Sequence, residues 1–378
     1  TSDAITMASD GTCTAKITGM TGGGGLSNRN IIVNGDMRVA QRSVGPIAVS
    51  DNTNEGYQTI DRMRFGFGNS AAGACNISQS TDAPTTLGFT KSHKTDVTTV
   101  NTTASGQQVI QMFYRIEGQD IRNSGWNHLS SSSFLTLSFY FKTTKTGTSK
   151  LPIMFRTRHG TNYYYVKNVT VTDPTNWNRY TVTIPGNSNI QIDDANTVGM
   201  DINFTYYSGP DKDTSSEGSW GSTNAYSTSD STNYFDSTSN DMFITGIQLE
   251  AGDTATSFEH RSFGEELVRC QRYYEHSYNY GTTPGTASNS GSVMFLTNRS
   301  PGTAHTMLRY MTRKRAAPTL VSYDPTQSNT TGMRNLDDSV TYSYSMNRNG
   351  ETGCTAYPSG SLNLGRFIQF HYTADAEL

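Results

Sequence analysis

The sequence predicts an all-β protein with two β-sandwich domains, joined by one short helix and preceded by a stem segment. Hydrophobic residues make up 34% of the chain and charged residues 16%, with an excess of Ser, Thr, Asn, Gly and Tyr that suits exposed strands and turns. Apolar and polar residues alternate with a period of two in many short segments, whereas a helical period is convincing only once. A length of 378 residues suits two domains and still allows a substantial core.

Residues 1–30 are predicted to form a stem or connector. A short strand-like run at Ala15–Thr18 is followed by the Gly22–Gly25 tetrad, whose glycines favour a flexible hinge. A phosphate-binding loop is not indicated, because no Lys-Ser or Lys-Thr follows these glycines and no helix pattern begins there. Because the chain begins at Thr1 rather than Met, we expect an upstream anchoring segment to be missing.

Residues 31–261 are predicted to form a β-sandwich. The clearest strand is Leu135–Lys142, in which every second residue is apolar. The same alternation recurs in Val169–Val171, Tyr180–Ile184 and Phe243–Leu249. Many short antiparallel strands of this kind are typical of a sandwich.

The segment Ser208–Asn240 interrupts this rhythm, because Ser, Thr, Asn, Asp and Gly dominate it. Four aromatic residues lie within it: Trp220, Tyr226, Tyr234 and Phe235. A compact domain seldom keeps so long a loop without a use for it.

Residues 262–276 are predicted to form the linking helix, and residues 277–378 a smaller second β-domain. Ser262 and Glu265 have the spacing of a capping box. Four residues then share one helix face: Phe263, Leu267, Cys270 and Tyr274. Strands are expected at Val293–Thr297, Val340–Met346 and Phe367–Tyr372.

Charge and hydropathy exclude two classes of partner. The net charge is -3 and no basic stripe interleaved with aromatics occurs, so nucleic acid is not expected as a partner. No apolar run of 18 residues and no signal-peptide pattern occur, so membrane insertion is not expected. Four widely spaced cysteines fit free, partly buried thiols better than disulfides: Cys13, Cys75, Cys270 and Cys354.

Five segments of the sequence carry a resemblance to known proteins: NRNIIVNGDMRVAQRS, YQTIDRMRF, WNRYTVTIP, ITGIQLEAGDTATSFEHRSFGEELVRCQRYYE and the ending FHYTADAEL. They resemble modular sequences of tail fibres and other surface proteins of marine and cyanobacterial phages. The first domain also resembles jelly-roll carbohydrate-binding modules, with Asn34-Gly35 near its start and Gln248–Glu250 in its last strand. It departs from that pattern at Met63, where those modules usually carry Trp after the Asp-Arg pair.

This resemblance implies a homotrimeric fibre protein of the virion, made in the host cytoplasm, that attaches to host cells by binding surface polysaccharide. It implies contact with other virion tail proteins through the N-terminus. Two alternatives are a structural decoration or connector protein that binds no glycan, and a polysaccharide-degrading tailspike. We expect no enzymatic activity, because no nucleophile elbow, zinc-binding helix, Walker loop or Cys-x-x-Cys pair occurs.

Aromatic side chains are the first candidates for glycan contacts, because sugar rings pack their apolar faces on aromatic planes. Trp220 has no core pattern around it, so it lies either on an exposed face or in a small cluster beneath its own loop; Tyr226 shares that loop. Tyr163 and Tyr165 belong to a run of three tyrosines that cannot all face inward on a strand, which indicates either trimer packing or glycan stacking.

The last expectations concern cations and a metal. Arg299, Arg309 and the run Arg313–Arg315 give the second domain a positive character, either as a solvated face or as a contact for acidic polysaccharide, and we place host recognition there with support from Ser208–Asn240. No cofactor is expected except a structural calcium, which jelly-roll modules often hold and for which Asp36 and Glu250 are the candidate ligands. Chelation is not expected to abolish folding.

Overall fold

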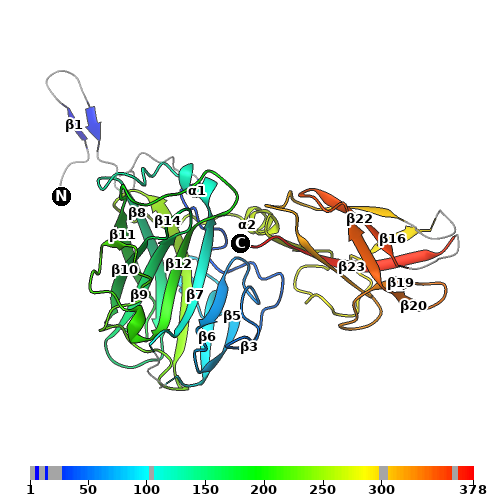
Figure 1. The fold of residues 1–378 in the computed structure, drawn as a ribbon, viewed down its shortest axis with the longest axis horizontal. Coiled ribbons are helices and arrows are strands. Elements are labelled where there is room, and N and C mark those ends of the chain that lie inside the picture. Colours follow the sequence, from blue (N-terminus) through cyan, green and yellow to red (C-terminus); the bar gives the residue numbers. More distant parts are fainter. Residues whose placement is uncertain (1–4, 8–12, 16–27, 102–105, 298–304, 360–364) are drawn as a thin grey trace. The chain divides into compact units, whose positions relative to one another are not determined.

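The chain is an all-β protein, as the sequence predicts (Figure 1). The structure is a computed structural model that describes residues 5–7, 13–15, 28–101, 106–297, 305–359 and 365–378. It divides into two compact units. The first comprises Thr1–Met37, Ala48–Gly56 and Arg64–His260, and the second comprises Arg38–Ile47, Tyr57–Met63 and Arg261–Leu378. The division predicted from the sequence differs in two respects. It assigned residues 38–47 and 57–63 to the first domain, and it treated the helix as a separate linker, whereas all three segments belong to the second unit.

The first unit is a sandwich of two six-stranded antiparallel sheets. The sheet that we call the β12 sheet has the order β13 (Trp220–Gly221), β10 (Tyr164–Val171), β9 (Ser149–Thr157), β12 (Val198–Ser208), β7 (Val109–Glu117) and β4 (Arg64–Gly68). The β14 sheet has the order β11 (Asn178–Pro185), β8 (Phe134–Thr143), β14 (Asp241–Ala251), β6 (Ser92–Thr99), β5 (Ala74–Ser80) and β3 (Ile47–Ser50). A separate hairpin pairs β1 (Ile5–Met7) with β2 (Cys13–Ala15). The Gly22–Gly25 tetrad of the predicted stem lies outside the described residues.

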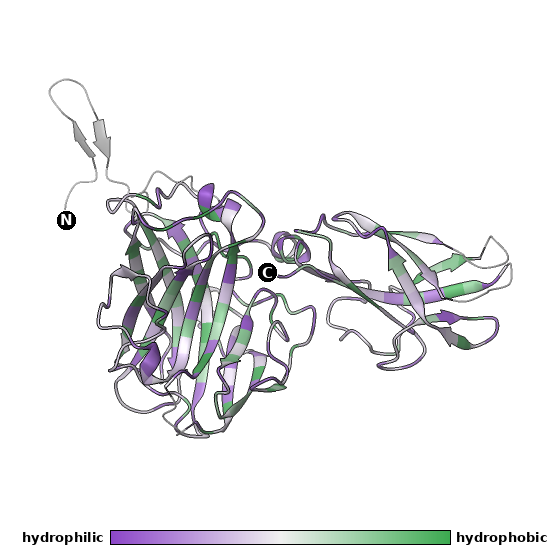
Figure 2. Cartoon of the chain, in the orientation of Figure 1, coloured by the Kyte–Doolittle hydropathy of each residue, from purple (hydrophilic) through white to green (hydrophobic). Residues whose placement is uncertain are grey.

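Alternation along the strands builds the core between the two sheets, and Figure 2 shows hydrophilic and hydrophobic residues alternating along them. Every apolar residue of the predicted strand is fully buried in β8: Leu135, Leu137, Phe139 and Phe141. Phe139 meets Phe204 of β12 edge to face, with ring centroids 5.1 Å apart. Successive side chains of a strand point to opposite faces, so these residues fill the space between the sheets.

Short helices connect the strands of the first unit. They are α1 (Gly118–Arg122) and the 3-10 turns η1 (Thr85–Leu87) and η2 (Pro210–Lys212). The last lies in the long polar segment, which is more ordered than its composition indicates. That segment returns Tyr234 and Phe235 to the core, both with no exposed surface, and supplies β13.

The second unit is built around β23 (Phe367–Asp375), which pairs with four other strands. Its larger sheet also contains β15 (Tyr274–His276), β16 (Val293–Leu296), β18 (Thr319–Tyr323), β19 (Met333–Asn335) and β20 (Val340–Tyr342). A three-stranded sheet has the order β17 (Thr306–Arg309), β22 (Gly353–Pro358) and β21 (Tyr344–Asn347). Phe370 and Ile368 of β23 are fully buried in the hydrophobic cluster of this unit.

The predicted capping box is present in α2 (Phe263–Gln271). The Ser262 side chain accepts from the Glu265 backbone N–H, and the Glu265 carboxylate accepts from the Ser262 backbone N–H at 3.0 Å. The predicted helix was too long, however, because α2 ends at Gln271 and Tyr274 belongs to β15. Tyr274 pairs with Asp375 of β23, and strand pairing there replaces the next helical turn.

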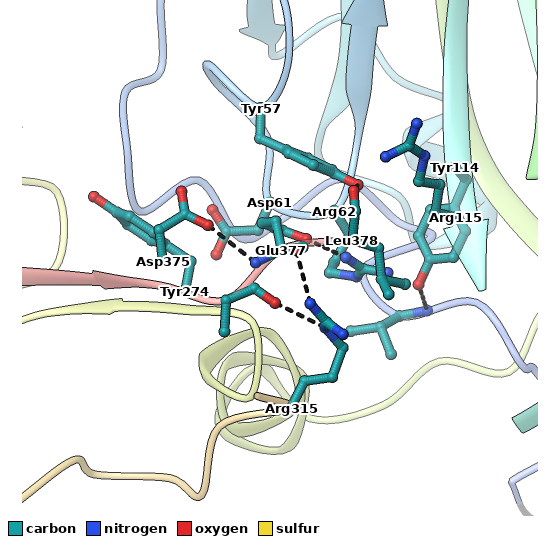
Figure 3. A network of polar contacts seen from close by, with 12 residues as sticks. Tyr57, Asp61, Arg62, Tyr114, Arg115, Tyr274, Arg315, Asp375, Glu377 and Leu378 are labelled. Carbon is teal, nitrogen blue, oxygen red and sulfur yellow. Dashed lines mark hydrogen bonds and ion pairs between the residues drawn. The ribbon is translucent and has the colours of Figure 1, made fainter. Parts of the chain in front are cut away.

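A buried charge network closes the second unit around its last residues (Figure 3). Arg62 has no exposed surface; it pairs with Glu377, and its guanidinium lies 3.5 Å from the Tyr273 ring centroid. Arg42 lies 2.9 Å from Asp375 and 3.5 Å from Glu377. The segments 38–47 and 57–63 are thereby joined to the end of the chain within one unit.

Three of the four cysteines are described with their side chains. Cys75, Cys270 and Cys354 are free and buried, and burial raises the pKa of each thiol. Across the residues that can be searched, no helix has both the length and the apolar character needed to cross a membrane.

Candidate functional site

A cavity of about 380 Å³ lies in the first unit between β10 and β11. We call it the edge cleft, because β11 ends the β14 sheet and only the two-residue β13 lies beyond β10 in the β12 sheet. Residues of both strands line it: Tyr165, Lys167, Asn168, Val169, Thr170, Arg179, Tyr180, Thr181, Val182 and Thr183.

Aromatic side chains lie at this edge. Tyr165 pairs with Trp220 in the register of β10 and β13, and their ring centroids are 5.5 Å apart. Trp220 is half-buried and its indole N–H donates to the carbonyl of Pro185 at 2.7 Å, which ties β13 to the end of β11. Tyr180, also half-buried, lines the opposite wall of the cleft. The cleft therefore has aromatic surface from both sheets.

The tyrosine hydroxyls remain protonated. Burial raises the pKa of Tyr165, and nearby Glu217 raises it further; burial and Asp173 do the same for Tyr180. The Tyr165 hydroxyl donates to the carbonyl of Thr183 at 3.4 Å. Both hydroxyls can therefore act as hydrogen-bond donors at neutral pH.

Two cations stand at the walls of the cleft. The Lys167 ammonium lies 3.0 Å from Glu217, and 49% of its side chain is exposed. Arg179 donates to the hydroxyl of Ser138 at 2.9 Å and to the carbonyl of Thr256, so its position is fixed. No Asp or Glu occurs among the described residues that line the cleft. The cleft thus presents donors and aromatic planes.

The structure brings together two of the predicted aromatic residues and separates the others. Tyr165 and Trp220 are neighbours, whereas Tyr163 is half-buried outside the cavity lining. Tyr226 packs in a cluster with Tyr164 and Ala225, and Tyr164 precedes Tyr165 on the opposite face of β10. The glycan-binding role of these residues stays a prediction.

Sequence reasoning missed Tyr180, Lys167 and Arg179 as members of a site. One signal was present, because the period of two puts Lys167 on the same face of β10 as Tyr165. No sequence pattern shows that β10 and β11, which lie in different sheets, face each other across a cavity.

The arginines predicted in the second unit lie apart from the edge cleft. Arg299 is outside the described residues. Arg313 is exposed and pairs with Glu351 at 2.5 Å. The interpretation of the run Arg313–Arg315 as a positive surface is wrong for Lys314, whose side chain has no exposed surface and pairs with Glu275 at 2.5 Å. Arg309 lines a separate cavity of about 550 Å³ in this unit.

The candidate calcium ligands have different surroundings. Asp36 is buried, with 4% of its surface exposed. Glu250 accepts hydrogen bonds from the backbone N–H of Thr256 at 2.8 Å and from the Thr256 hydroxyl at 2.7 Å. Where side chains are described, no group of three or more His, Cys, Asp or Glu residues could hold a metal ion. A calcium site at Asp36 and Glu250 stays a prediction.

The comparisons with known proteins return structures only. Neither a family model nor a curated protein matches the sequence. A putative sugar-binding protein from Bacteroides thetaiotaomicron is similar at 10% identity, with a TM-score of 0.31, over 58% of this chain and 99% of that chain. A family 11 carbohydrate-binding module from Clostridium thermocellum is similar at 12% identity, with a TM-score of 0.28, over 57% and 99%. The enzymatically active domain of tailspike protein 4 from bacteriophage CBA120 is similar at 12% identity, with a TM-score of 0.30, over 59% of this chain and 21% of that chain.

Proposed function

We propose that this protein is a viral tail or surface fibre protein that attaches the virion to host cells by binding cell-surface polysaccharide in the edge cleft. The observation that supports this most directly is the cleft itself, a cavity of about 380 Å³ with Tyr165 and Tyr180 on its walls and Trp220 beside it. The resemblance of the sequence to phage fibre proteins supplies the biological context.

The chemistry of the cleft suits a sugar residue. Its volume lies within the range of roughly 300–1,000 Å³ that is usual for small-ligand sites. A pyranose ring can lay its apolar face on Tyr180, and its hydroxyls can accept from the Lys167 ammonium or exchange hydrogen bonds with the hydroxyls of Thr181 and Thr183.

The lining favours binding over cleavage. Glycoside hydrolysis ordinarily uses a pair of carboxyl groups on either side of the scissile bond. The described lining of the edge cleft supplies none, and the carboxylate of Glu217 pairs with Lys167. We therefore propose a protein that retains the polysaccharide intact.

Attachment by a weak single site is effective in a multimer. We propose a homotrimer, made in the host cytoplasm and joined to other virion tail proteins through its N-terminus. Three linked sites can raise avidity by roughly 10² to 10⁴. Light scattering should give three times the chain mass of 41.4 kDa. A mass of one chain at micromolar concentration, with any upstream segment included, would contradict the trimer.

The second unit offers an alternative place for recognition. Its cavity of about 550 Å³ is lined by Tyr278, Tyr280, Arg309 and Met311 among others, and most of its lining belongs to residues 277–378, which the sequence favoured for host contact. Arg309→Ala tests this site. If Arg309→Ala removes adsorption while the edge-cleft variant below retains it, recognition belongs to the second unit.

The decisive experiment measures binding of host envelope polysaccharide to the intact protein and, in the same samples, the release of oligosaccharides. Tyr180→Ala should weaken binding about tenfold, which corresponds to about 1.4 kcal/mol. Tyr163→Ala is the matched control, because Tyr163 lies in the same part of the unit but outside the cavity lining. Thermal unfolding shows whether each variant retains its fold.

Each outcome has one interpretation. Equal binding by wild type and Tyr180→Ala rejects the edge cleft. No polysaccharide binding by the trimer supports the structural decoration or connector protein instead. Released oligosaccharides support the polysaccharide-degrading tailspike.

A further inference from the structure

A serine and a histidine of the second unit form a hydrogen-bonded pair beside its cavity. Ser277 follows β15 directly, and β23 carries His371. The Ser277 hydroxyl lies 2.8 Å from Nδ1 of His371. The pairing of the two strands continues through Ser277, whose backbone N–H donates to the carbonyl of Tyr372 at 3.1 Å. The sheet therefore fixes the two side chains against each other.

The contacts of the imidazole decide which nitrogen carries the hydrogen. Nε2 of His371 lies 2.8 Å from the carbonyl oxygen of Ser288. A carbonyl oxygen can only accept, so Nε2 carries the hydrogen and, in the neutral ring, Nδ1 holds a lone pair. Burial lowers the pKa of His371, and the nearby His276 lowers it further, whereas the Ser288 carbonyl opposes this change. At neutral pH the Ser277 hydroxyl therefore donates to Nδ1.

Packing holds the imidazole in this orientation. His371 has no exposed surface, and its ring stacks on the Tyr278 ring with centroids 3.6 Å apart and planes 14° from parallel. The Tyr278 hydroxyl accepts from the backbone N–H of Gly285 at 3.0 Å, within the loop that also carries Ser288. A buried, oriented imidazole whose lone pair meets a hydroxyl has the arrangement of a general base beside a nucleophile.

Ser277 meets a cavity as well as the base. It is half-buried and lines the cavity of about 550 Å³ in this unit, which we call the second-unit cavity. The backbone N–H of Tyr372 donates to Oγ of Ser277 at 3.0 Å and so stabilises negative charge that develops on this atom. Arg309 is an exposed residue of the same lining, and its guanidinium can donate to a carbonyl oxygen of a ligand. The cavity thus combines a nucleophile, a base and room for a small ligand.

We propose that Ser277 is a nucleophile, activated by His371 as general base, which hydrolyses small acyl esters of sugar hydroxyls in the second-unit cavity. The substrate class, a sugar ester, rests on the proposed polysaccharide-binding function, whereas the catalytic pair rests on the contacts above. Its two residues lie 94 positions apart in the sequence, so they belong to none of the catalytic motifs named earlier. The reaction leaves glycosidic bonds intact and uses residues separate from the edge cleft.

The reaction needs only the ester and water. Oγ of Ser277 attacks the carbonyl carbon of the ester while its proton moves to Nδ1 of His371. The bond between that carbon and the sugar oxygen then breaks, and the sugar oxygen takes the proton from Nδ1. Water, deprotonated by the same nitrogen, attacks the acyl-serine and releases a carboxylic acid, while the proton returns to Oγ. The net reaction converts ester and water into a sugar hydroxyl and an acid.

Covalent labelling of the intact protein tests the nucleophile directly. A fluorophosphonate probe reacts with a serine hydroxyl that a neighbouring base activates, and mass spectrometry of peptides locates the adduct. We expect the adduct on Ser277 in the wild type and in the exposed-serine control Ser290→Ala, and no adduct at this position in His371→Gln. A wild-type protein that carries no adduct on Ser277 would overturn the proposal, whatever the variants show.

Hydrolysis of p-nitrophenyl acetate and of acetylated xylan measures the reaction itself. Ser277→Ala and His371→Gln should each slow hydrolysis at least about 10²-fold, the lower end of what a general base contributes. Ser290→Ala removes the same hydroxyl from an exposed position of the same unit and should retain the wild-type rate. Thermal unfolding shows whether each variant keeps its fold. Equal rates for the wild type and a folded Ser277→Ala variant would also overturn the proposal.

The outcomes separate this proposal from the proposed function. Polysaccharide binding that is lost in Tyr180→Ala, together with no labelling and no hydrolysis, rejects the catalytic pair alone. Hydrolysis that depends on Ser277, together with polysaccharide binding that does not depend on Tyr180, rejects the edge cleft alone. Hydrolysis of p-nitrophenyl acetate by Ser277 without acetate release from acetylated xylan or host polysaccharide would overturn the sugar ester as substrate.

Discussion

His93 should make the stability of the first unit sensitive to acid. It lies on β6 with 1% of its surface exposed, and its ring stacks on Phe65 with centroids 6.3 Å apart and planes 4° from parallel. Its Nδ1 atom is buried without a hydrogen-bond partner. Burial lowers the pKa of His93 from 6.5 to about 4. The native protein therefore holds this imidazole in its neutral form.

The sign and size of the effect follow from this lowered pKa. Between pH 6.5 and about pH 4 the unfolded chain takes up a proton at His93 and the native chain does not, so acidification favours unfolding. The contribution of His93 to the free energy of unfolding is complete above about pH 6.5 and is lost as the pH falls towards 4. At 1.36 kcal/mol for each pH unit, the loss amounts to about 3 kcal/mol.

His93→Leu removes the titratable imidazole and replaces it with an apolar side chain of similar size. Denaturant unfolding at several pH values between 4 and 7 should show the wild type losing about 3 kcal/mol more than the variant over this range. His159→Leu is the control, because His159 is exposed and lies in the same unit. Parallel pH profiles for the wild type and His93→Leu would refute the reasoning, since they would mean that another group carries the acid sensitivity.

Two further predictions concern buried charge and backbone strain. Glu275→Gln should lower the free energy of unfolding of the second unit by about 3–5 kcal/mol, because it leaves the Lys314 ammonium buried with only the carbonyls of Gln271 and Thr312. In chemical denaturation, the double variant that also carries Lys314→Met should recover part of that loss, and full additivity of the two substitutions would contradict a direct pair. Gly246→Ala should lower the free energy of unfolding of the first unit by about 2 kcal/mol, because φ at this position is +62° and the new Cβ would lie 2.8 Å from both the Phe89 and Tyr140 rings. The control Gly221→Ala meets no atom within 4 Å and should change the unfolding free energy by less than about 0.5 kcal/mol, so equal effects of the two substitutions would exclude strain at Gly246.

The sequence alone determined those local structures that depend on residues close together in the chain, such as single strands and helix starts. The alternation in Leu135–Lys142 predicted β8 to within one residue at each end, and Pro185 marked the end of β11. Ser262 and Glu265 predicted the start of α2, because a capping box depends on residues three positions apart. Composition predicted the all-β class, because turns and half-buried strands each favour particular residue types.

Only the tertiary structure decided which strands are neighbours, and the edge cleft depends on that. A period of two tells which residues share a face of one strand but not which strand lies beside it. Arg115, Arg156 and Asp201 are far apart in sequence, and each reads as an ordinary polar position of its own strand. The order β9, β12, β7 and the register of their pairing bring the two arginines to the carboxylate of Asp201.

The same reason accounts for the interpretations that failed. The polar segment Ser208–Asn240 gave no strand signal, because β13 has only two residues and its pairing with β10 positions Trp220 against Tyr165. Lys314 reads as part of a basic surface run until Glu275, far from it in sequence, supplies a buried partner. The role of a charged or aromatic residue depends on the groups that contact it in the folded chain. Long-range strand pairing determines those contacts, and no local sequence pattern encodes that pairing.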